Sequence, residues 1–191
     1  MPDRFSADAA EQVLRDGGNA VDAAIAATFV LAVTYPEAGN IGGGGFMTSF
    51  VDGEAAFLDF REQAPAAAHR DMYLDEGGNF QQRMALVGGK AVGVPGTVKG
   101  MQMAHARYAS LPWERLLAPA IALAEQGFEV PAALARMAAE KVAGDAGETN
   151  FASYFGQMRA GEVFRQPELA ATLKRIAADP DVFYSGLPAR Q

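Results

Sequence analysis

The sequence predicts a layered α/β fold, because it contains a β-hairpin that is apolar on both faces and helical periodicity elsewhere. Two apolar runs flank Asp52-Gly53, and this dipeptide suits the positive φ angles of a type I′ hairpin turn. Successive side chains of each strand point to opposite faces, and large apolar side chains occupy both faces. We therefore expect helices or a second sheet to cover the hairpin on both sides.

The residues before the hairpin are expected to form two helices. Ser6 is a candidate N-cap for a first helix over residues 7–16, which a glycine pair ends. Asn19 can cap a second helix, with Asp22 as its partner in a capping-box-like pair, and Pro36 ends that helix. Its apolar stripe consists of Val21, Ala24, Ile25, Thr28, Phe29 and Ala32. Alanine and valine fill its other faces, so we expect it to be buried nearly all round.

The residues after the hairpin are expected to be mainly helical. Residues 86–96 are predicted to form a strand interrupted by glycines, which Pro95-Gly96 turns into a helix. Helices are expected from Thr97, from Pro112 to Gly127 with a kink or break at Pro119, over residues 131–142 and over residues 167–178. Residues 144–161 are expected to form a polar loop. We find no internal repeat and no low-complexity linker, so residues 1–191 are expected to form a single domain.

The composition argues against several functional classes. The chain has 191 residues, a formal net charge of −7 and no Lys/Arg cluster, which argues against a nucleic-acid partner. It contains no cysteine, which excludes disulfides, cysteine zinc sites and thiol catalysis. Residues 20–35 carry only one charge but are too few to span a membrane. The N-terminus lacks the apolar segment of a signal peptide.

The open end of the predicted hairpin is the candidate ligand site. Four consecutive glycines precede the first strand, and antiparallel pairing across the turn would bring Gly44 opposite Arg61. A guanidinium beside a backbone without side chains suits a small carboxylate ligand, because its donors can bind both carboxylate oxygens. The alternative is an intramolecular ion pair of Arg61 with Asp59 or Glu62. The residues by themselves leave both interpretations open.

Other catalytic and binding motifs are missing. The glycine run leads into a strand and lacks the Gly-Lys-Ser/Thr of a phosphate-binding loop. No G-x-S-x-G motif is present. His69 and His105 lie far apart in the sequence and lack metal-ligand spacing, so surface or helix-packing roles are expected for both.

Long motifs resemble the γ-glutamyltransferase family (γ-glutamyl transpeptidase, glutathione hydrolase), in particular its bacterial members. They are D-G-G-N-A-V-D-A-A-I-A, Y-P-E-A-G-N-I-G-G-G-G-F-M, L-D-F-R-E-Q-A-P-A-A-A-H-R-D-M-Y-L-D and G-V-P-G-T-V-K-G-M. L-L-A-P-A-I-A-L-A-E-Q-G-F-E-V, Q-P-E-L-A-A-T-L-K-R-I-A and F-Y-S-G follow in the same order. The resemblance therefore spans almost the whole chain.

This resemblance implies an N-terminal nucleophile hydrolase fold, an αββα sandwich that is incomplete in this chain. The family is made as one precursor that cleaves itself into a large and a small subunit. The N-terminal threonine of the small subunit attacks the γ-glutamyl carbonyl of a donor such as glutathione, and water, an amino acid or a dipeptide accepts the acyl group. No metal or cofactor is implied. The family arginine that binds the donor α-carboxylate lies in D-F-R-E, so the resemblance gives that role to Arg61.

The chain also departs from the family pattern. The catalytic threonine belongs to a Thr-Thr-His-type motif, and none of the six threonines is followed by threonine or histidine: Thr28, Thr34, Thr48, Thr97, Thr149 and Thr172. We therefore expect part of a large subunit that has no catalytic residue of its own and requires a small subunit from the same precursor. The alternatives are a related acylase, acting on β-lactam side chains or poly-γ-glutamate, and a non-catalytic truncated remnant. Bacterial relatives are periplasmic or secreted, so the resemblance implies the same location.

Overall fold

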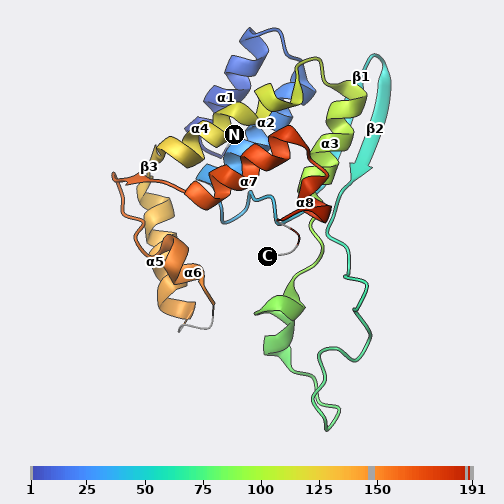
Figure 1. Cartoon of the computed structure of the whole chain (residues 1–191), viewed down its shortest axis with the longest axis vertical. Coiled ribbons are helices and arrows are strands. Elements are labelled where there is room, and N and C mark those ends of the chain that lie inside the picture. Colours follow the sequence, from blue (N-terminus) through green and yellow to red (C-terminus); the bar gives the residue numbers. More distant parts are fainter. Residues whose placement is uncertain (1, 146–148, 188, 190–191) are drawn as a thin grey trace.

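The computed structural model describes residues 2–145, 149–187 and 189. The long helices are α1 (Arg4–Arg15), α2 (Ala20–Thr34), α3 (Thr97–Tyr108), α4 (Trp113–Gln126), α5 (Ala132–Asp145) and α7 (Pro167–Ala178). The shorter elements are β1 (Phe46–Val51), β2 (Glu54–Asp59), η1 (Gln82–Ala85), η2 (Gly89–Ala91), β3 (Phe128–Glu129), α6 (Phe151–Phe155), β4 (Val163–Phe164) and α8 (Val182–Ser185). Helices α1, α2, α4 and α7 pack together, the β1–β2 hairpin lies beside α3, and residues 64–95 form an arm that extends away from the helices (Figure 1).

Helix α1 begins three residues earlier than predicted. Asp3, not Ser6, is the N-cap, and its carboxylate accepts a 2.7 Å hydrogen bond from the backbone N–H of Ser6. A carboxylate caps at least as well as a hydroxyl, so the earlier aspartate takes the capping position. The side chain of Ser6 is fully buried inside the first turn instead.

Helix α2 is capped and largely buried, as predicted. The capping box is present, because Asn19 accepts from the backbone of Val21 and Asp22 while the Asp22 carboxylate accepts a 2.8 Å bond from the backbone N–H of Asn19. Most residues of α2 are buried, and the ring of Phe29 meets the edge of Trp113 from α4 at a centroid distance of 5.4 Å. Neighbouring helices therefore surround α2 on most sides.

The β1–β2 hairpin has the predicted register and turn. Phe46 pairs with Asp59 and Val51 with Glu54, and Asp52 and Gly53 have φ angles of 52° and 84°. Positive φ at both positions is the requirement of a type I′ turn, and Gly53 meets it without a steric penalty.

The prediction that both hairpin faces are covered is wrong for the residues that the structure describes. The inner face carries Met47, Val51 and Leu58, which pack against the helical core. The outer face consists of Phe46, Thr48, Phe50, Ala55, Phe57 and Asp59, which are all exposed. The second small sheet pairs β3 with β4 and is separate from the hairpin, so it supplies no cover. In the described parts of the chain, helices thus pack on one side of the hairpin and leave the other side open.

The second half of the chain mixes confirmed and incorrect predictions. Helix α3 begins at Thr97 and α7 has the predicted bounds. Helix α4 runs through Pro119 to its end before Gly127. Helix α5 begins one residue later than predicted and extends three residues past the predicted end at 142. Residues 86–96 do not form a strand. Only Val94 pairs, in an isolated bridge with Gln63, because the glycines there favour turns and 3₁₀ segments over a continuous ladder.

The predicted polar loop over residues 144–161 contains a helical turn, α6, in its described part, and residues 146–148 lie outside the described residues. The two-residue strands β3 and β4 were not predicted, because segments this short carry no periodic signal. No helix among the described residues is long and apolar enough to cross a membrane.

Candidate functional site

Arg61 lies directly after the paired residues of β2, at the open end of the hairpin. Its backbone N–H donates a 3.0 Å hydrogen bond to Oδ1 of Asp59. Its side chain is exposed, and the guanidinium carbon lies 5.9 Å from the ring centroid of Phe46, on the outer face. A cation at this distance from a ring is held weakly and still has its hydrogen-bond donors available.

The ion-pair alternative for Arg61 is not formed. Among the described residues, no carboxylate lies within ion-pair distance of the guanidinium. The carboxylate of Asp59 instead accepts from the Arg61 backbone. An exposed guanidinium without a carboxylate neighbour can bind an external anion with both of its terminal nitrogens.

The backbone of the glycine run lies beside Phe60 and Arg61, as the predicted pairing requires. Gly45 and Phe60 exchange backbone hydrogen bonds of 3.3 and 3.0 Å. A Cβ atom at Gly44 would lie 2.6 Å from the carbonyl oxygen of Phe60 and 2.9 Å from the carbonyl carbon of Arg61. Gly44 therefore permits a close backbone approach here, a packing role that exists without any ligand.

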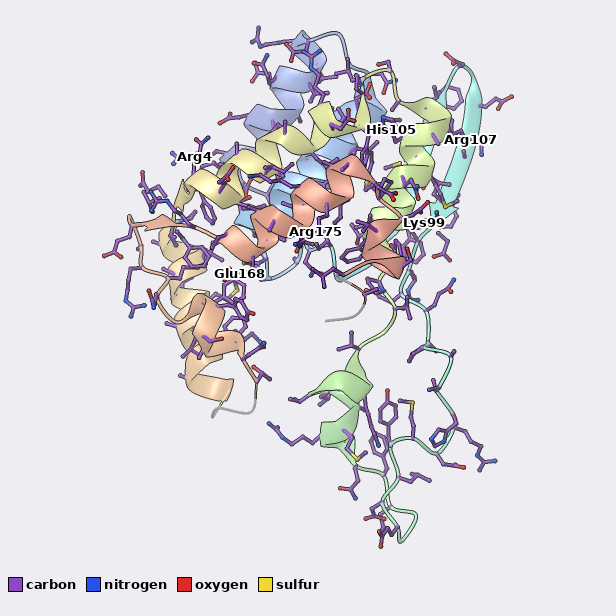
Figure 2. The ribbon with its side chains drawn as sticks, in the orientation of Figure 1. Arg4, Lys99, His105, Arg107, Glu168 and Arg175 are labelled. Atoms are coloured by element: carbon purple, nitrogen blue, oxygen red, sulfur yellow. The ribbon has the colours of Figure 1, made fainter. Side chains whose placement is uncertain are left out.

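A cavity of about 460 Å³ adjoins Arg61. Its lining includes Arg61, Lys99 near the start of α3, and Asp181 and Tyr184 at α8. Tyr184 Oη accepts a 2.9 Å hydrogen bond from the backbone N–H of Lys99, and Lys99 Nζ lies 3.2 Å from Oδ1 of Asp181. Figure 2 shows Lys99 where α3 and α8 come together. Burial raises the pKa of the Tyr184 hydroxyl, so this group stays neutral at neutral pH.

Sequence reasoning did not assign Lys99, Asp181 or Tyr184 to this cavity. They lie more than 35 positions beyond Arg61 in the numbering, and α8 reaches the start of α3 only through tertiary packing. The motifs G-V-P-G-T-V-K-G-M and F-Y-S-G, which contain Lys99 and Tyr184, were the available signal.

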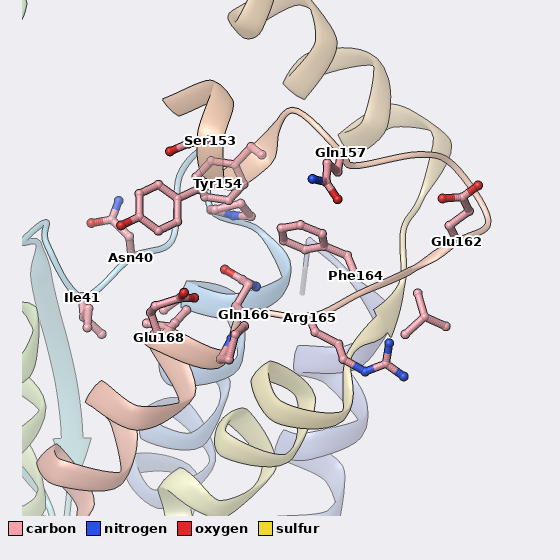
Figure 3. Close-up of a pocket in the computed structure, with 16 residues that line it drawn as sticks. Asn40, Ile41, Ser153, Tyr154, Gln157, Glu162, Phe164, Arg165, Gln166 and Glu168 are labelled. Atoms are coloured by element: carbon pink, nitrogen blue, oxygen red, sulfur yellow. The ribbon is translucent and has the colours of Figure 1, made fainter. Parts of the chain in front are cut away.

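A larger cavity, of about 880 Å³, lies between the loop after α2 and the segment from α6 to the start of α7. Polar side chains line it, among them Asn40, Gln166 and Glu168 (Figure 3). Gln166 Nε2 donates a 2.8 Å hydrogen bond to the carbonyl oxygen of Val33 and so satisfies the C-terminal end of α2. Figure 3 shows the guanidinium of Arg165 directed away from Asn40 and Glu168, so among the described lining residues no cation points toward these two side chains.

Neither histidine belongs to either cavity. Nε2 of His105 lies 2.9 Å from the carbonyl oxygen of Leu111, and its ring packs against Trp113, so His105 has the helix-packing role expected from the sequence. His69 is exposed. In the part of the chain that the structure describes, no group of three His, Cys, Asp or Glu side chains could hold a metal ion.

Comparison with known proteins identifies the family that this chain matches. The family model described as Gamma-glutamyltranspeptidase matches residues 6–191. A glutathione hydrolase proenzyme of Pseudomonas aeruginosa is 56% identical over 186 residues, covering 97% of this chain and 33% of its own length. The chain thus spans about a third of the length of the curated relatives that it matches.

Solved structures of γ-glutamyltranspeptidases are also similar to this chain. The γ-glutamyltranspeptidase from Pseudomonas nitroreducens, solved in complex with L-DON, superposes with a TM-score of 0.96 at 55% identity, over 100% of this chain and 57% of that chain. A cephalosporin acylase from Bacillus halodurans superposes with a TM-score of 0.83 at 28% identity, over 95% of this chain and 35% of that chain. The fold is the N-terminal nucleophile hydrolase αββα sandwich, represented here by one hairpin and its helical layer. The chain therefore belongs to the γ-glutamyltranspeptidase family.

Proposed function

We propose that this chain is the single-domain, N-terminal part of the large subunit of an enzyme that transfers or hydrolyses γ-glutamyl groups, with glutathione as a donor. Membership in the family and the 56% identity to a glutathione hydrolase proenzyme support this activity. The observation that carries the proposal is the exposed guanidinium of Arg61, which faces no carboxylate of the described chain and adjoins a cavity.

In this proposal, Arg61 binds the α-carboxylate of the γ-glutamyl donor. A guanidinium presents two parallel N–H groups that match the two oxygens of a carboxylate, whereas an ammonium binds as a point charge. The cavity of about 460 Å³ that adjoins Arg61 offers space for such a ligand. No step of the reaction requires Arg61 to donate or accept a proton. Its role is to hold the donor so that the γ-carbonyl is presented in one orientation.

The nucleophile belongs, in this proposal, to a partner subunit cut from the same precursor. Its N-terminal threonine hydroxyl adds to the γ-glutamyl carbonyl, the amine is expelled with a proton, and water or an acceptor amine then releases the acyl group. The names of the relatives support a precursor, since they are called proenzymes. The outer face of the hairpin supports a partner, because Phe46, Phe50 and Phe57 are 56%, 76% and 61% exposed. Exposed aromatic patches of this kind mark interfaces.

A hybrid proenzyme tests the proposal. This chain replaces the matching 186-residue segment of the P. aeruginosa relative, and the product is assayed for self-cleavage and for release of γ-glutamyl groups. We expect both activities. Arg61→Lys in the hybrid should raise KM for a γ-glutamyl donor by about 100-fold, from the loss of a bidentate charged contact worth about 3 kcal/mol.

Arg70→Lys is the matched control for Arg61→Lys. Arg70 lies on the arm, is highly exposed and forms an ion pair with the adjacent Asp71 at 3.0 Å, so the exchange should leave KM unchanged. Donor kinetics that are unaffected by Arg61→Lys would remove Arg61 from the site. A hybrid that folds but neither cleaves itself nor acts on a γ-glutamyl donor would favour the truncated remnant.

The related-acylase alternative is tested with the same hybrid. The similarity to the cephalosporin acylase of B. halodurans, at 28% identity, is the observation in its favour, and the much higher identity to glutathione hydrolases weighs against it. A substrate panel of glutathione, poly-γ-glutamate and a cephalosporin separates the three activities. We also propose a periplasmic or secreted location, as the resemblance implies, and fractionation of cells that express the natural gene tests it.

A further inference from the structure

The segment that carries Arg61 is bordered on both sides by glycine-rich backbone. On one side, Gly45 exchanges backbone hydrogen bonds with Phe60. On the other side, Gln63 and Val94 exchange bonds of 3.0 and 2.8 Å. The two flanking stretches are themselves joined, because the carbonyl oxygen of Gly43 accepts from the backbone N–H groups of Gly96 and Thr97 at 2.8 and 3.0 Å. Arg61 is thus held between two backbone stretches that are bonded to each other.

Gly96 and Gly100 lie so close to Phe60 that no side chain fits at either position. A Cβ atom at Gly96 would lie 1.9 Å from the carbonyl oxygen of Phe60 and 3.0 Å from that of Arg61. A Cβ atom at Gly100, one helical turn further along α3, would lie 2.2 Å from Cγ and 2.6 Å from Cβ of Phe60. Gly96 has a φ angle of −110°, which any residue can adopt, so space and not backbone conformation requires glycine here.

We propose that Gly96 and Gly100 are positioning residues for Arg61, which they hold in register with the donor by packing against Phe60. The proposal rests on the assigned role of Arg61 in donor binding. Gly96 contacts the backbone of Phe60 and Gly100 contacts the root of its ring, so neither contact can be relieved by rotating the end of a side chain. Helix α3 and the hairpin therefore meet at Phe60 without intervening atoms, and the position of α3 sets the position of Arg61.

The size of the effect follows from the contacts. A Cβ atom at Gly96 forces the backbone of Phe60 and Arg61 to move by about 1 Å, and a displacement of about 1 Å at a binding group can lower a rate by about 100-fold. The group displaced is the one that binds the donor α-carboxylate. The loss should therefore fall on donors that have this carboxylate and spare those that lack it.

The test compares two anilide donors in the hybrid proenzyme, γ-glutamyl-p-nitroanilide and 4-aminobutyryl-p-nitroanilide, which lacks only the α-carboxylate. For Gly96→Ala and Gly100→Ala we expect kcat/KM for the first donor to fall by about 10- to 100-fold, mainly through KM, and for the second to change less than about twofold. Phe60→Leu loosens the same contact without adding atoms. It should lower the donor ratio, which is kcat/KM for the γ-glutamyl donor divided by kcat/KM for the 4-aminobutyryl donor, by about fivefold. This variant decides the question if the alanine variants do not fold.

Two other glycines separate positioning from stability. A Cβ atom at Gly18 would lie 2.8 Å from Val13 and 2.9 Å from Leu111, so Gly18→Ala should lower the Tm but leave the donor ratio unchanged. Gly89 has no atom within 4 Å of its Cβ position, so Gly89→Ala should change neither quantity. A donor ratio that is unchanged in Gly96→Ala, Gly100→Ala and Phe60→Leu, while Arg61→Lys still lowers it, would overturn the positioning role. A ratio that Arg61→Lys also leaves unchanged would instead remove Arg61 from the donor site, the part of the proposed function on which this role rests.

Discussion

Tyr184 Oη accepts a 2.9 Å hydrogen bond from the backbone N–H of Lys99 and so joins α8 to the first turn of α3. Helix α3 has no side-chain N-cap, because Gly96 occupies that position. The backbone N–H groups of a first helical turn have no partner within the helix, so a tertiary contact satisfies one of them here. A hydroxyl more than 80 positions away in the sequence thus takes the place of a local cap.

Tyr184→Phe should therefore lower the stability of the fold by about 1 kcal/mol, since it removes one hydrogen bond and leaves a helix N–H without a partner. The thermal unfolding midpoint of the hybrid proenzyme measures the change. Tyr154→Phe is the control. Tyr154 is 51% exposed, so the loss of its hydroxyl should leave the thermal unfolding midpoint unchanged. Equal midpoints for Tyr184→Phe and the unsubstituted hybrid would mean that the bond contributes nothing.

Asp22 should make stability depend on pH in the acidic range. Burial raises the pKa of its carboxyl group, but hydrogen bonds from Ser110, Asn19 and Leu111 outweigh burial and hold this pKa below its ordinary value of 3.8. A lowered pKa in the folded state stabilises the fold above the unfolded-state pKa, and this stabilisation is lost as pH falls through the folded-state pKa. We expect the unfolding midpoint to fall steeply below about pH 4.

Asp22→Asn separates this contribution from those of other carboxylates. The buried amide cannot accept as many hydrogen bonds, so the substitution should cost about 2–3 kcal/mol at pH 7 and flatten the acid limb of the stability curve. Asp8→Asn, at an exposed position of α1, should have neither effect. An acid limb that is equally steep with Asn at position 22 would assign the pH dependence to other groups.

The outer hairpin face should control the solution behaviour of the isolated chain. Phe50 is 76% exposed on this face. On the same face, the rings of Phe46 and Phe57 stack on each other, with 5.6 Å between their centroids. An uncovered apolar strand face promotes association, so the isolated 191-residue chain should aggregate or be partly molten. Phe50→Thr should reduce light scattering by the isolated chain and weaken retention of the partner subunit in the cleaved hybrid.

Leu14→Gln serves as the matched surface substitution for Phe50→Thr. Leu14 is 51% exposed on α1, on a different part of the surface from the hairpin, so its replacement should affect neither light scattering nor subunit retention. An isolated chain that is monodisperse and unfolds cooperatively would contradict the assignment of the outer face as an interface.

Local sequence determined the elements whose signals are complete within a few residues. Asp52-Gly53 predicts the type I′ turn and with it the whole register from Val51–Glu54 to Phe46–Asp59. The Asn19/Asp22 pair predicts the start of α2. The start of α1 was misplaced, because Asp3 and Ser6 are both good caps and tertiary contacts, including the burial of Ser6, choose between them.

At the candidate site, too, the local sequence predicts one part of the arrangement and tertiary packing decides the rest. The sequence alone brought Gly44 next to Arg61, since strand pairing is set by the turn, but it left the ion pair of Arg61 with Asp59 or Glu62 open. Only the tertiary structure decided that the Asp59 carboxylate accepts from the Arg61 backbone, that Lys99 and Tyr184 line the cavity beside Arg61, and that α3 meets Phe60 at two glycines. Turn and cap signals act over a few residues, whereas contacts between distant segments depend on how helices pack, and that packing carries no local signal in the chain.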